Sequence, residues 1–169
     1  KMLFEEAGLD QKQPTTTREE LNEYAEDLNN PPAVYGMQFP GASEEQLVMR
    51  WYMFLRGAGG DSLEENGCAA CNSAAGVEAA TLYQTMFEQD LVPVDVLSTS
   101  ANDNDKALAA GTYAMGVVGS WFFNFAVEAG IDTPEAFNET FGVAPVPSPD
   151  GTPSPSSAGG WTVALPASA

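Results

Sequence analysis

Residues 107–121 read ALAAGTYAMGVVGSW, and this pattern predicts the end of a helix, a buried strand and a Gly-Ser turn that is followed by a Trp. Small residues run into Gly111, and an apolar run follows over 113–119. A strand that is apolar on both faces is typical of a sheet covered by helices. Trp121 follows directly after Gly119 and Ser120. Two interpretations fit it: a core residue at the start of a helix, or a binding platform presented by the strand end.

The rest of the chain alternates helical and strand patterns. Thr17 and Glu20 form a capping-box pair, Ser43 is predicted to cap the next long helix, and Asn102 or Asp103 is predicted to cap a shorter one. The predicted helices cover 2–7, 17–28, 43–56, 73–93, 100–111, 121–130 and 133–142, and the predicted strands cover 33–39, 113–119, 141–147 and 161–169. This alternation predicts an α/β fold in which helices flank a short mixed or parallel sheet.

The charge balance of the chain is strongly acidic. It has 24 Asp and Glu residues, 6 Lys and Arg residues and no His, for a formal net charge of -18. Binding to nucleic acid or to an anionic membrane needs basic side chains, so the composition argues against both. The acids are dispersed along the chain, which is typical of a protein kept soluble by self-repulsion. We therefore predict a halophilic or marine source.

Catalysis finds little support in the sequence. The absence of His excludes a Ser-His-Asp arrangement, and Ser120 lies in GSW rather than in G-x-S-x-G. Two carboxylates can hydrolyse a glycoside, but no spacing pairs any two of the acids. We predict no catalytic residue, no cofactor and no metal site. A carbohydrate-active enzyme domain with paired carboxylates remains the alternative.

The two cysteines, Cys68 and Cys71, lie close together in the segment GCAACNS. A zinc site is disfavoured because the chain has no His and no second Cys pair. A redox motif normally opens a helix after a strand, whereas this pair lies among Gly, Asn and Ser. The pattern favours a local disulfide in an exported protein, followed by free thiols and then by redox catalysis.

Three segments, taken together, resemble a known family. KMLFEEAGLDQKQPTTTREEL (1–21), ALAAGTYAMGVVGSW (107–121) and FGVAPVPSPDGTPSPSSAGGWTVAL (141–165) are similar, in order and spacing, to segments of the extracellular solute-binding proteins of ABC transporters, specifically the sugar-binding family. The resemblance covers essentially the whole chain. Two features depart from it: Thr17 stands where the family usually has Trp, and the Cys pair is not a family feature.

The resemblance implies a fold and a function. The chain would form one lobe of a periplasmic-binding-protein type II fold, with 1–158 as an incomplete second lobe and 159–169 as a strand returning toward a first lobe that is missing. It would bind sugars or oligosaccharides and deliver them to the membrane permease of an ABC importer, outside the cell or in the periplasm, with a lipid anchor in the full-length protein. A homodimer through the exposed lobe seam is a further expectation. An interaction module that binds no ligand is the other alternative.

The resemblance also implies a role for Trp121, which matches a sugar-stacking Trp of the family. Aromatic rings stack on the flat C–H faces of sugars and bury apolar area. Gly119 and Ser120 would let the backbone approach the ligand. Gln38, at the end of the strand 33–39, and Arg50, on the following helix, are predicted to hydrogen-bond sugar hydroxyls.

The segment Gly159, Gly160 and Trp161 is the second predicted wall of the site. In the family this Gly-Gly pair lines the cleft, and the next residue contacts sugar. The alternative is a turn at the entry to the hinge, with Trp161 packed between lobes.

Overall fold

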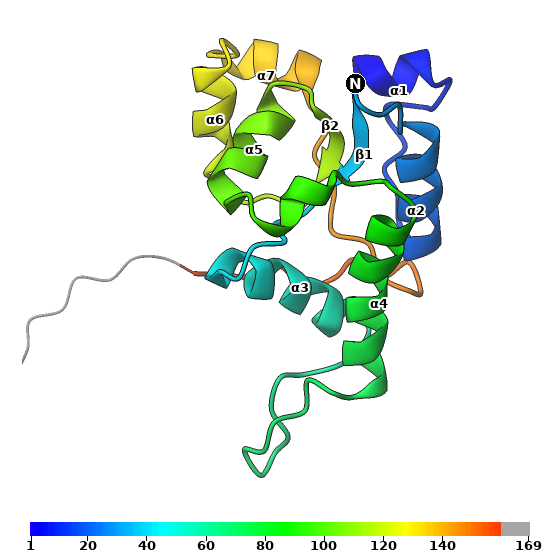
Figure 1. The fold of residues 1–169 in the computed structure, drawn as a ribbon, viewed down its shortest axis with the longest axis vertical. Helices are drawn as coiled ribbons and strands as arrows, with labels where there is room; N and C mark the ends of the chain where they lie inside the picture. The colour runs from blue at the N-terminus through cyan, green and yellow to red at the C-terminus, as the bar shows by residue number, and fades with distance from the viewer. Residues whose placement is uncertain (160–169) are drawn as a thin grey trace, which may run out of the picture.

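The computed structural model describes residues 1–159, which form a small parallel sheet surrounded by helices (Figure 1). The elements are α1 (Met2–Glu6), α2 (Arg18–Asp27), β1 (Tyr35–Gln38), α3 (Glu45–Gly57), α4 (Ala74–Glu88), the 3-10 helix η1 (Val94–Leu97), α5 (Ala101–Ala109), β2 (Tyr113–Gly116), α6 (Phe122–Glu128) and α7 (Pro134–Thr140). The predicted α/β class is therefore confirmed. Every helix predicted from the sequence is present, and the predicted strand 161–169 lies outside the described residues.

The sheet consists of β1 and β2, which run parallel with Tyr35 opposite Tyr113 and Gln38 opposite Gly116. The long connection through α3, α4 and α5 brings the two strands together, as a parallel pair requires. Both carboxyl ends consequently lie side by side. A Cβ atom at position 116 would lie 2.8 Å from the Gln38 Oε1 atom, so a larger residue there would displace the Gln38 side chain.

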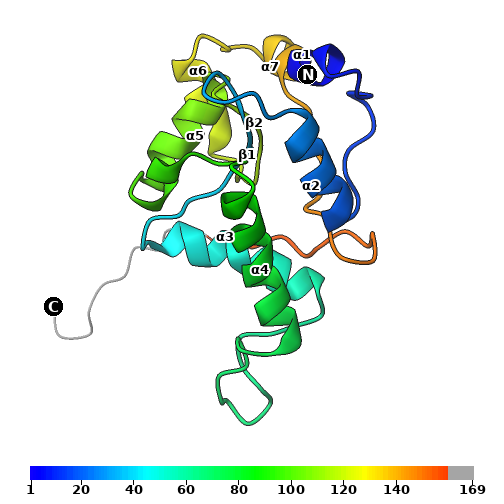
Figure 2. The ribbon, with the colours of Figure 1, turned by 45° about the vertical axis from the view of Figure 1, so that its right-hand side comes forward.

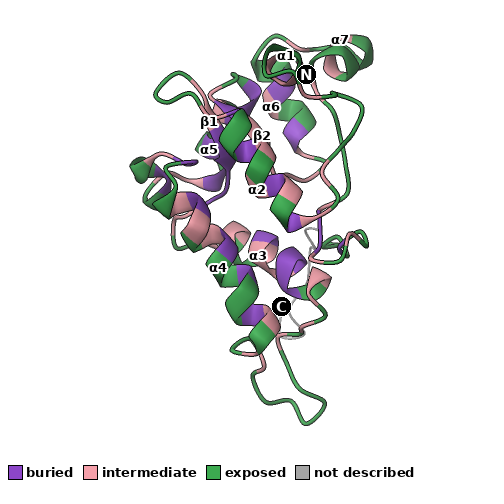
Figure 3. Cartoon of the chain, turned by 90° about the vertical axis from the view of Figure 1, so that its right-hand side faces the viewer, coloured by how far each residue is buried: buried purple, intermediate pink, exposed green. Residues whose placement is uncertain are grey.

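Helices pack on both sides of the strands. Figures 1 and 2 show α5, α6 and α7 on one side of β1 and β2, and α1 and α2 on the other. The larger core cluster joins α2, β1, α3 and α4 around Leu21, Ala25, Met37, Phe39, Phe54, Leu55, Leu82, Met86, Leu91 and Val96. The smaller cluster joins α5, β2 and α6 around Leu108, Ala109, Tyr113 and Phe122. In Figure 3 the buried bands on α2, α3 and α4 correspond to the larger cluster.

The contact between α2 and the sheet depends on a glycine. A Cβ atom at Gly36 would lie 1.9 Å from the carbonyl oxygen of Ala25, which is fully buried on α2. The backbone of β1 therefore lies directly against the backbone of α2, and any side chain at position 36 would force them apart. This close approach fixes α2 on the side of the sheet opposite α5.

The predicted capping box of α2 is present. The Thr17 side chain accepts a hydrogen bond from the backbone N–H of Glu20 at 3.1 Å, and the Glu20 carboxylate accepts from the backbone N–H of Thr17 at 3.2 Å. The N–H groups of residues 16 and 17 and the Thr16 hydroxyl all donate to Glu20, and these bonds lower the pKa of its carboxyl.

Thr17→Ala should lower the free energy of unfolding by about 1 kcal/mol, because the Glu20 N–H loses its acceptor. Urea unfolding of the chain measures this change. Thr81→Ala is the matched control, since Thr81 is exposed on α4 and its hydroxyl bonds only the Val77 carbonyl of the same helix. The control should change stability by less than about 0.5 kcal/mol, and equal losses in the two variants would refute the capping role.

Two predicted helix caps were wrong by one to three residues. The N-cap of α3 is Glu44 rather than Ser43, and the Glu44 carboxylate accepts a hydrogen bond from the backbone N–H of Ala101 at the start of α5. The N-cap of α5 is Ser100 rather than Asn102 or Asp103, and its hydroxyl accepts from the Asp103 N–H at 3.2 Å. The start of α3 thus supports the start of α5 by a tertiary contact that no local pattern contains.

Two predicted strands also differ from the structure. β2 ends at Gly116, three residues before the predicted end at 119. The predicted strand 141–147 does not form, and the nearest bridge pairs Ser148, just after it, with Thr17. Pro145 and Pro147 supply no N–H to a ladder, which explains why this extended segment stays outside the sheet.

Candidate functional site

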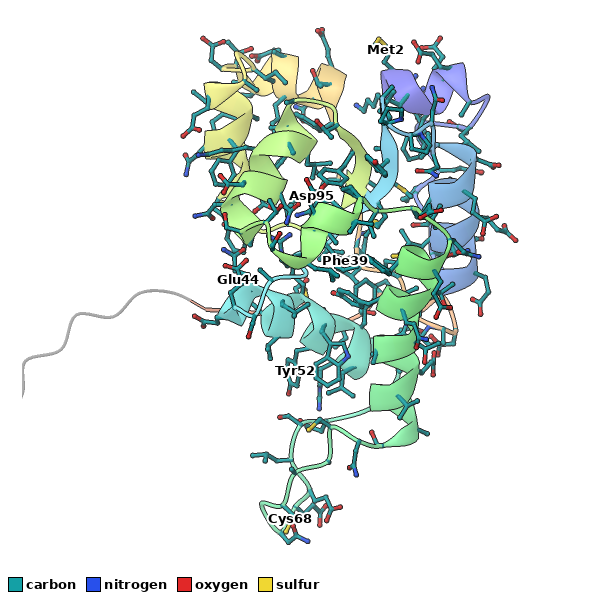
Figure 4. The ribbon with its side chains drawn as sticks, in the orientation of Figure 1. Met2, Phe39, Glu44, Tyr52, Cys68 and Asp95 are labelled. Carbon is teal, nitrogen blue, oxygen red and sulfur yellow. The ribbon has the colours of Figure 1, made fainter. Side chains whose placement is uncertain are left out.

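The carboxyl ends of β1 and β2 form the edge at which a ligand is expected in an open α/β sheet. Gln38 and Gly116 are the paired last residues of the two strands. The chain leaves β1 toward α3 and leaves β2 toward α6, so the first turns of both helices lie near this edge. In Figure 4 the labelled Phe39 lies just past the end of β1 and Glu44 lies at the start of α3.

Trp121 stands at the beginning of α6 and is half-buried. Its indole Nε1–H donates a hydrogen bond to Asp105 Oδ2 at 2.9 Å. A Cβ atom at Gly119 would lie 2.1–2.5 Å from atoms of the six-membered ring of the indole, so that ring lies against the Gly119 backbone. One part of the indole is thereby held by the protein, and the ring still keeps part of its surface open to solvent.

The Asp105 carboxylate is completely buried and joins four elements. Both of its oxygens lie 2.9 Å from Nη2 of Arg50 on α3, and Oδ1 also accepts from Gln38 Nε2 of β1 at 3.1 Å. Arg50 Nη1 in turn donates to Gln38 Oε1 at 3.1 Å. Asp105 is 0 % exposed, Arg50 1 % and Gln38 0 %. We call Gln38, Arg50, Asp105 and the indole N–H of Trp121 the buried network.

Gln38 and Arg50 were predicted to bond sugar hydroxyls directly, and the structure places them differently. Both are buried, and their polar groups are directed at each other and at Asp105. Neither presents a surface that a solute can reach in this conformation. Their contacts hold Asp105 and, through it, the Trp121 indole, and their direct contact with a ligand stays a prediction.

The neighbouring side chain Gln46 extends the buried network toward the surface. Its Oε1 accepts from Arg50 Nη2 at 2.9 Å, and its Nε2 lies 3.4 Å from Asn102 Oδ1 on α5. Gln46 is partly exposed. It is therefore a polar group at the mouth of the same site, on the first turn of α3.

Asp105 and Gln46 are site residues that the sequence interpretation missed. Asp105 was not singled out from the dispersed acids, yet Ala101, Asn104, Asp105 and Leu108 follow the i, i+3, i+4, i+7 spacing of the buried face of α5. Acidic side chains are almost never fully buried unless they are paired. An Asp on the apolar face of a helix was thus the available signal.

Asn104, beside Asp105 on the buried face of α5, is fixed to β2 by a second polar contact. Its Oδ1 accepts from the Tyr113 hydroxyl at 3.0 Å, and its amide nitrogen donates to the Thr99 carbonyl at 3.3 Å. Burial raises the pKa of Tyr113 to about 12, so its hydroxyl stays protonated and acts as the donor at neutral pH. The contact holds α5 against the strand that leads to Trp121.

The other predicted site residues lie around this edge to different degrees. Ser120 is exposed in the turn before Trp121. Gly159 is exposed at the end of a segment that runs along α3, where the Ser157 hydroxyl donates to the Met49 carbonyl at 3.3 Å. Gly160 and Trp161 lie outside the described residues, and their roles stay predictions.

Two surface depressions lie away from Trp121. One, of 380 Å³, lies between α2 and α4, and the other, of 520 Å³, lies beside the end of α3 and the segment 149–155. Neither is lined by a residue predicted to bind ligand. Trp121 lines neither of these two depressions.

Cys68 and Cys71 lie in the long loop between α3 and α4, which projects away from the helices in Figure 3, and Figure 4 labels Cys68 on this loop. The loop folds back on itself through an antiparallel bridge between Leu63 and Ala69. Cys68 and Cys71 are both exposed and free in the structure, so the predicted disulfide is not formed here and its formation stays a prediction. No helix in the described part of the chain combines the length and the apolar character that a membrane crossing requires.

The chain is similar to known proteins in both sequence and structure. The family model described as bacterial extracellular solute-binding protein matches residues 1–169. A search of curated proteins finds no match to the sequence. Among solved structures, a solute-binding protein of an ABC transporter from Thermotoga lettingae TMO, bound with alpha-D-tagatose, is 27% identical, with a TM-score of 0.77 over 90% of this chain.

Two further solved structures are similar. A solute-binding protein of an ABC transporter from Agrobacterium radiobacter K84, in complex with ribitol, is 26% identical, with a TM-score of 0.73 over 91% of this chain. Maltose-bound MalE3 of T. maritima is 24% identical, with a TM-score of 0.74 over 90% of this chain, and supports the fold. The chain covers 38%, 37% and 38% of these three proteins, respectively.

Proposed function

The chain belongs to the bacterial extracellular solute-binding protein family, and we propose that it is one lobe of a two-lobed protein that binds carbohydrate for an ABC importer. Two similar structures that exceed 25% identity hold alpha-D-tagatose and ribitol. Both ligands are small and rich in hydroxyl groups. A sugar or a related polyol is therefore the ligand class that these similarities favour.

The observation that carries the proposal is the anchored, half-buried indole of Trp121. Its N–H is bound to a buried carboxylate at 2.9 Å, and its six-membered ring lies on Gly119 at the carboxyl edge of the sheet. A ring held in this way offers an apolar surface on which the C–H face of a sugar can stack. Ser120, exposed beside it, and Gln46 supply hydroxyl and amide groups for the sugar hydroxyls.

The remaining parts of the proposal concern the intact protein. Residues 1–158 would form the second lobe, and 159–169 would return toward a first lobe that supplies the opposite wall. Lobe closure around the sugar would be the state that the membrane permease recognises. The family is extracellular by description, so the protein acts outside the cytoplasm. A lipid anchor, and a homodimer through the lobe seam, complete the proposal.

Sugar binding should require both lobes. In the two-lobed protein, maltose, D-tagatose or ribitol at about 100 times its dissociation constant should stabilise the fold by about 2.7 kcal/mol. The 169-residue chain alone should bind with a millimolar dissociation constant or not detectably, because half of the contacts are missing. Thermal-shift screening checks both.

A micromolar dissociation constant for the chain alone would contradict the two-lobed arrangement, and the absence of any shift across the panel would contradict sugar binding. The family binds solutes rather than transforming them, and we propose that this chain has no enzymatic activity. Incubation with oligosaccharides, followed by product analysis, separates binding from the carbohydrate-active enzyme alternative.

We also propose that the acidic surface adapts the protein to high salt. With a net charge of -18, self-repulsion should destabilise the folded chain at low ionic strength. Raising KCl from about 0.1 M to about 1 M shortens the screening length from about 10 Å to about 3 Å. The melting temperature should then rise by about 2–4 °C or more.

The matched control for this salt effect removes charge instead of screening it. Glu23 and Asp27 are exposed on α2, and neither takes part in a recorded ion pair. Glu23→Gln combined with Asp27→Asn should raise the low-salt melting temperature and flatten its dependence on KCl. A melting temperature that does not rise with salt would count against the halophilic interpretation.

A further inference from the structure

The ion pair between Arg50 and Asp105 is an unusual use of charge in this chain. Only 6 basic side chains accompany 24 acidic ones, yet one of the 6 is buried to 1 % exposure against a carboxylate at 0 % exposure. Replacing a buried ion pair by well-packed apolar groups is often neutral or even stabilising. The pair is therefore weak evidence for stability alone, and its other contacts indicate what it does.

The hydrogen-bonding capacity of the Asp105 carboxylate is fully used. An ionised carboxylate offers roughly four acceptor sites on its two oxygens. Oδ1 takes Gln38 Nε2 and Arg50 Nη2, and Oδ2 takes Arg50 Nη2 and the indole N–H of Trp121. The only one of these donors that belongs to a half-exposed side chain is the indole.

We propose that Asp105 is a positioning residue that holds the Trp121 indole in the orientation for sugar stacking, while Arg50 and Gln38 fix the carboxylate. This inference rests on the proposed function of Trp121 as a sugar platform. Asp105 itself touches no solute, because it is completely buried. It acts through the 2.9 Å bond to the indole Nε1.

Two constraints together leave the indole one orientation. Nε1–H is the only hydrogen-bond donor of a Trp side chain, so its bond to Asp105 sets the direction of the five-membered ring. The Gly119 backbone lies against atoms of the six-membered ring at the other end of the indole. A ring fixed at both ends loses little further rotamer freedom when a ligand stacks on it, which improves affinity.

Two side chains besides the indole hold the carboxylate of Asp105, which stands on α5. Arg50 comes from α3 and Gln38 from the end of β1. Arg50 Nη2 also donates a hydrogen bond to Gln46 Oε1 at 2.9 Å. The position of the platform is thus tied to β1, α3 and α5, and not only to the helix on which Trp121 stands.

The test separates positioning from stability with an apolar variant, Gln38→Met/Arg50→Met/Asp105→Leu, in the two-lobed protein. Removing all the buried polar partners together avoids leaving an unpaired charge, so the melting temperature should stay near that of the unmodified protein. Affinity for the panel member that binds best among maltose, D-tagatose and ribitol should nevertheless fall about tenfold, because the indole has lost its anchor. Unchanged affinity in a folded apolar variant would overturn the inference.

A second measurement does not depend on how the apolar variant folds. The indole N–H resonance of Trp121, identified by comparison with Trp51→Phe and Trp161→Phe variants, should exchange slowly with solvent in the unmodified chain. In Asp105→Asn, which keeps the side-chain shape, it should shift and exchange at least about tenfold faster. Rapid exchange in the unmodified chain would overturn the anchor.

The two proposals fail in different ways. One outcome is that Trp121→Ala binds sugar as tightly as the unmodified protein does, although the Trp121 indole N–H of the unmodified chain exchanges slowly. In that case Trp121 is not a sugar platform, and the role of Asp105 in binding is wrong as well. If Trp121→Ala loses affinity while the folded apolar variant does not, the platform stands and only the positioning role is wrong.

Discussion

Arg50→Met should lower the free energy of unfolding by about 3–5 kcal/mol. The substitution removes the cation that lies 2.9 Å from both oxygens of Asp105 and leaves that carboxylate buried and uncompensated. It also removes the donor to Gln38 Oε1 and a donor to Gln46 Oε1. Urea unfolding at neutral pH measures the loss.

Arg56→Met is the matched control, because it removes the same group from the same helix. Arg56 pairs with Asp61, and the two side chains are 39 % and 48 % exposed. Solvent screening leaves such a pair about 0–1 kcal/mol of stability. A loss for Arg50→Met no larger than that of the control would mean that the buried network does not constrain the fold.

Trp121→Ala should weaken sugar binding by the two-lobed protein by about 30-fold or more, which corresponds to about 2 kcal/mol or more of binding free energy. The variant removes the stacking surface and leaves Gly119 without its neighbour. The sugar affinity of Trp121→Phe should lie between those of the unmodified protein and Trp121→Ala, since Phe keeps an aromatic face but lacks the N–H that reaches Asp105. Isothermal titration with the best-binding sugar measures all three.

Phe123→Ala serves as the control for Trp121→Ala. Phe123 is also an aromatic residue of α6 and is 39 % exposed, but its ring packs toward Phe137, with ring centroids 5.6 Å apart. Its loss should change sugar affinity by less than about twofold. Equal losses for Phe123→Ala and Trp121→Ala would point to a general disturbance of α6 rather than to stacking.

The sequence predicted the local structure well where the signals are local. The capping box at Thr17 and Glu20 and the order of the helices and of the two observed strands were predicted because they depend on neighbouring residues. The strand predicted over 141–147 does not form, because Pro145 and Pro147 supply no N–H to a ladder. The cap of α3 failed because Glu44 bonds α5, which is a tertiary contact.

Some residues of the candidate site were singled out from the sequence, because their signals are local. Trp121 was singled out from its motif, and the structure gives it an anchored, half-buried ring. Gln38 and Arg50 lie at the same edge, but a sequence does not reveal that a third residue uses their hydrogen bonds. That residue, Asp105, lies 55 positions after Arg50 in the chain.

The central claim is contact between a sugar and the Trp121 ring, and intermolecular nuclear Overhauser effects in the two-lobed protein test it most directly. The indole resonances that disappear in Trp121→Ala belong to Trp121, and in the unmodified protein they should show such effects to the C–H protons of the bound sugar. A sugar that binds tightly and shows no effect to the Trp121 indole would contradict the account.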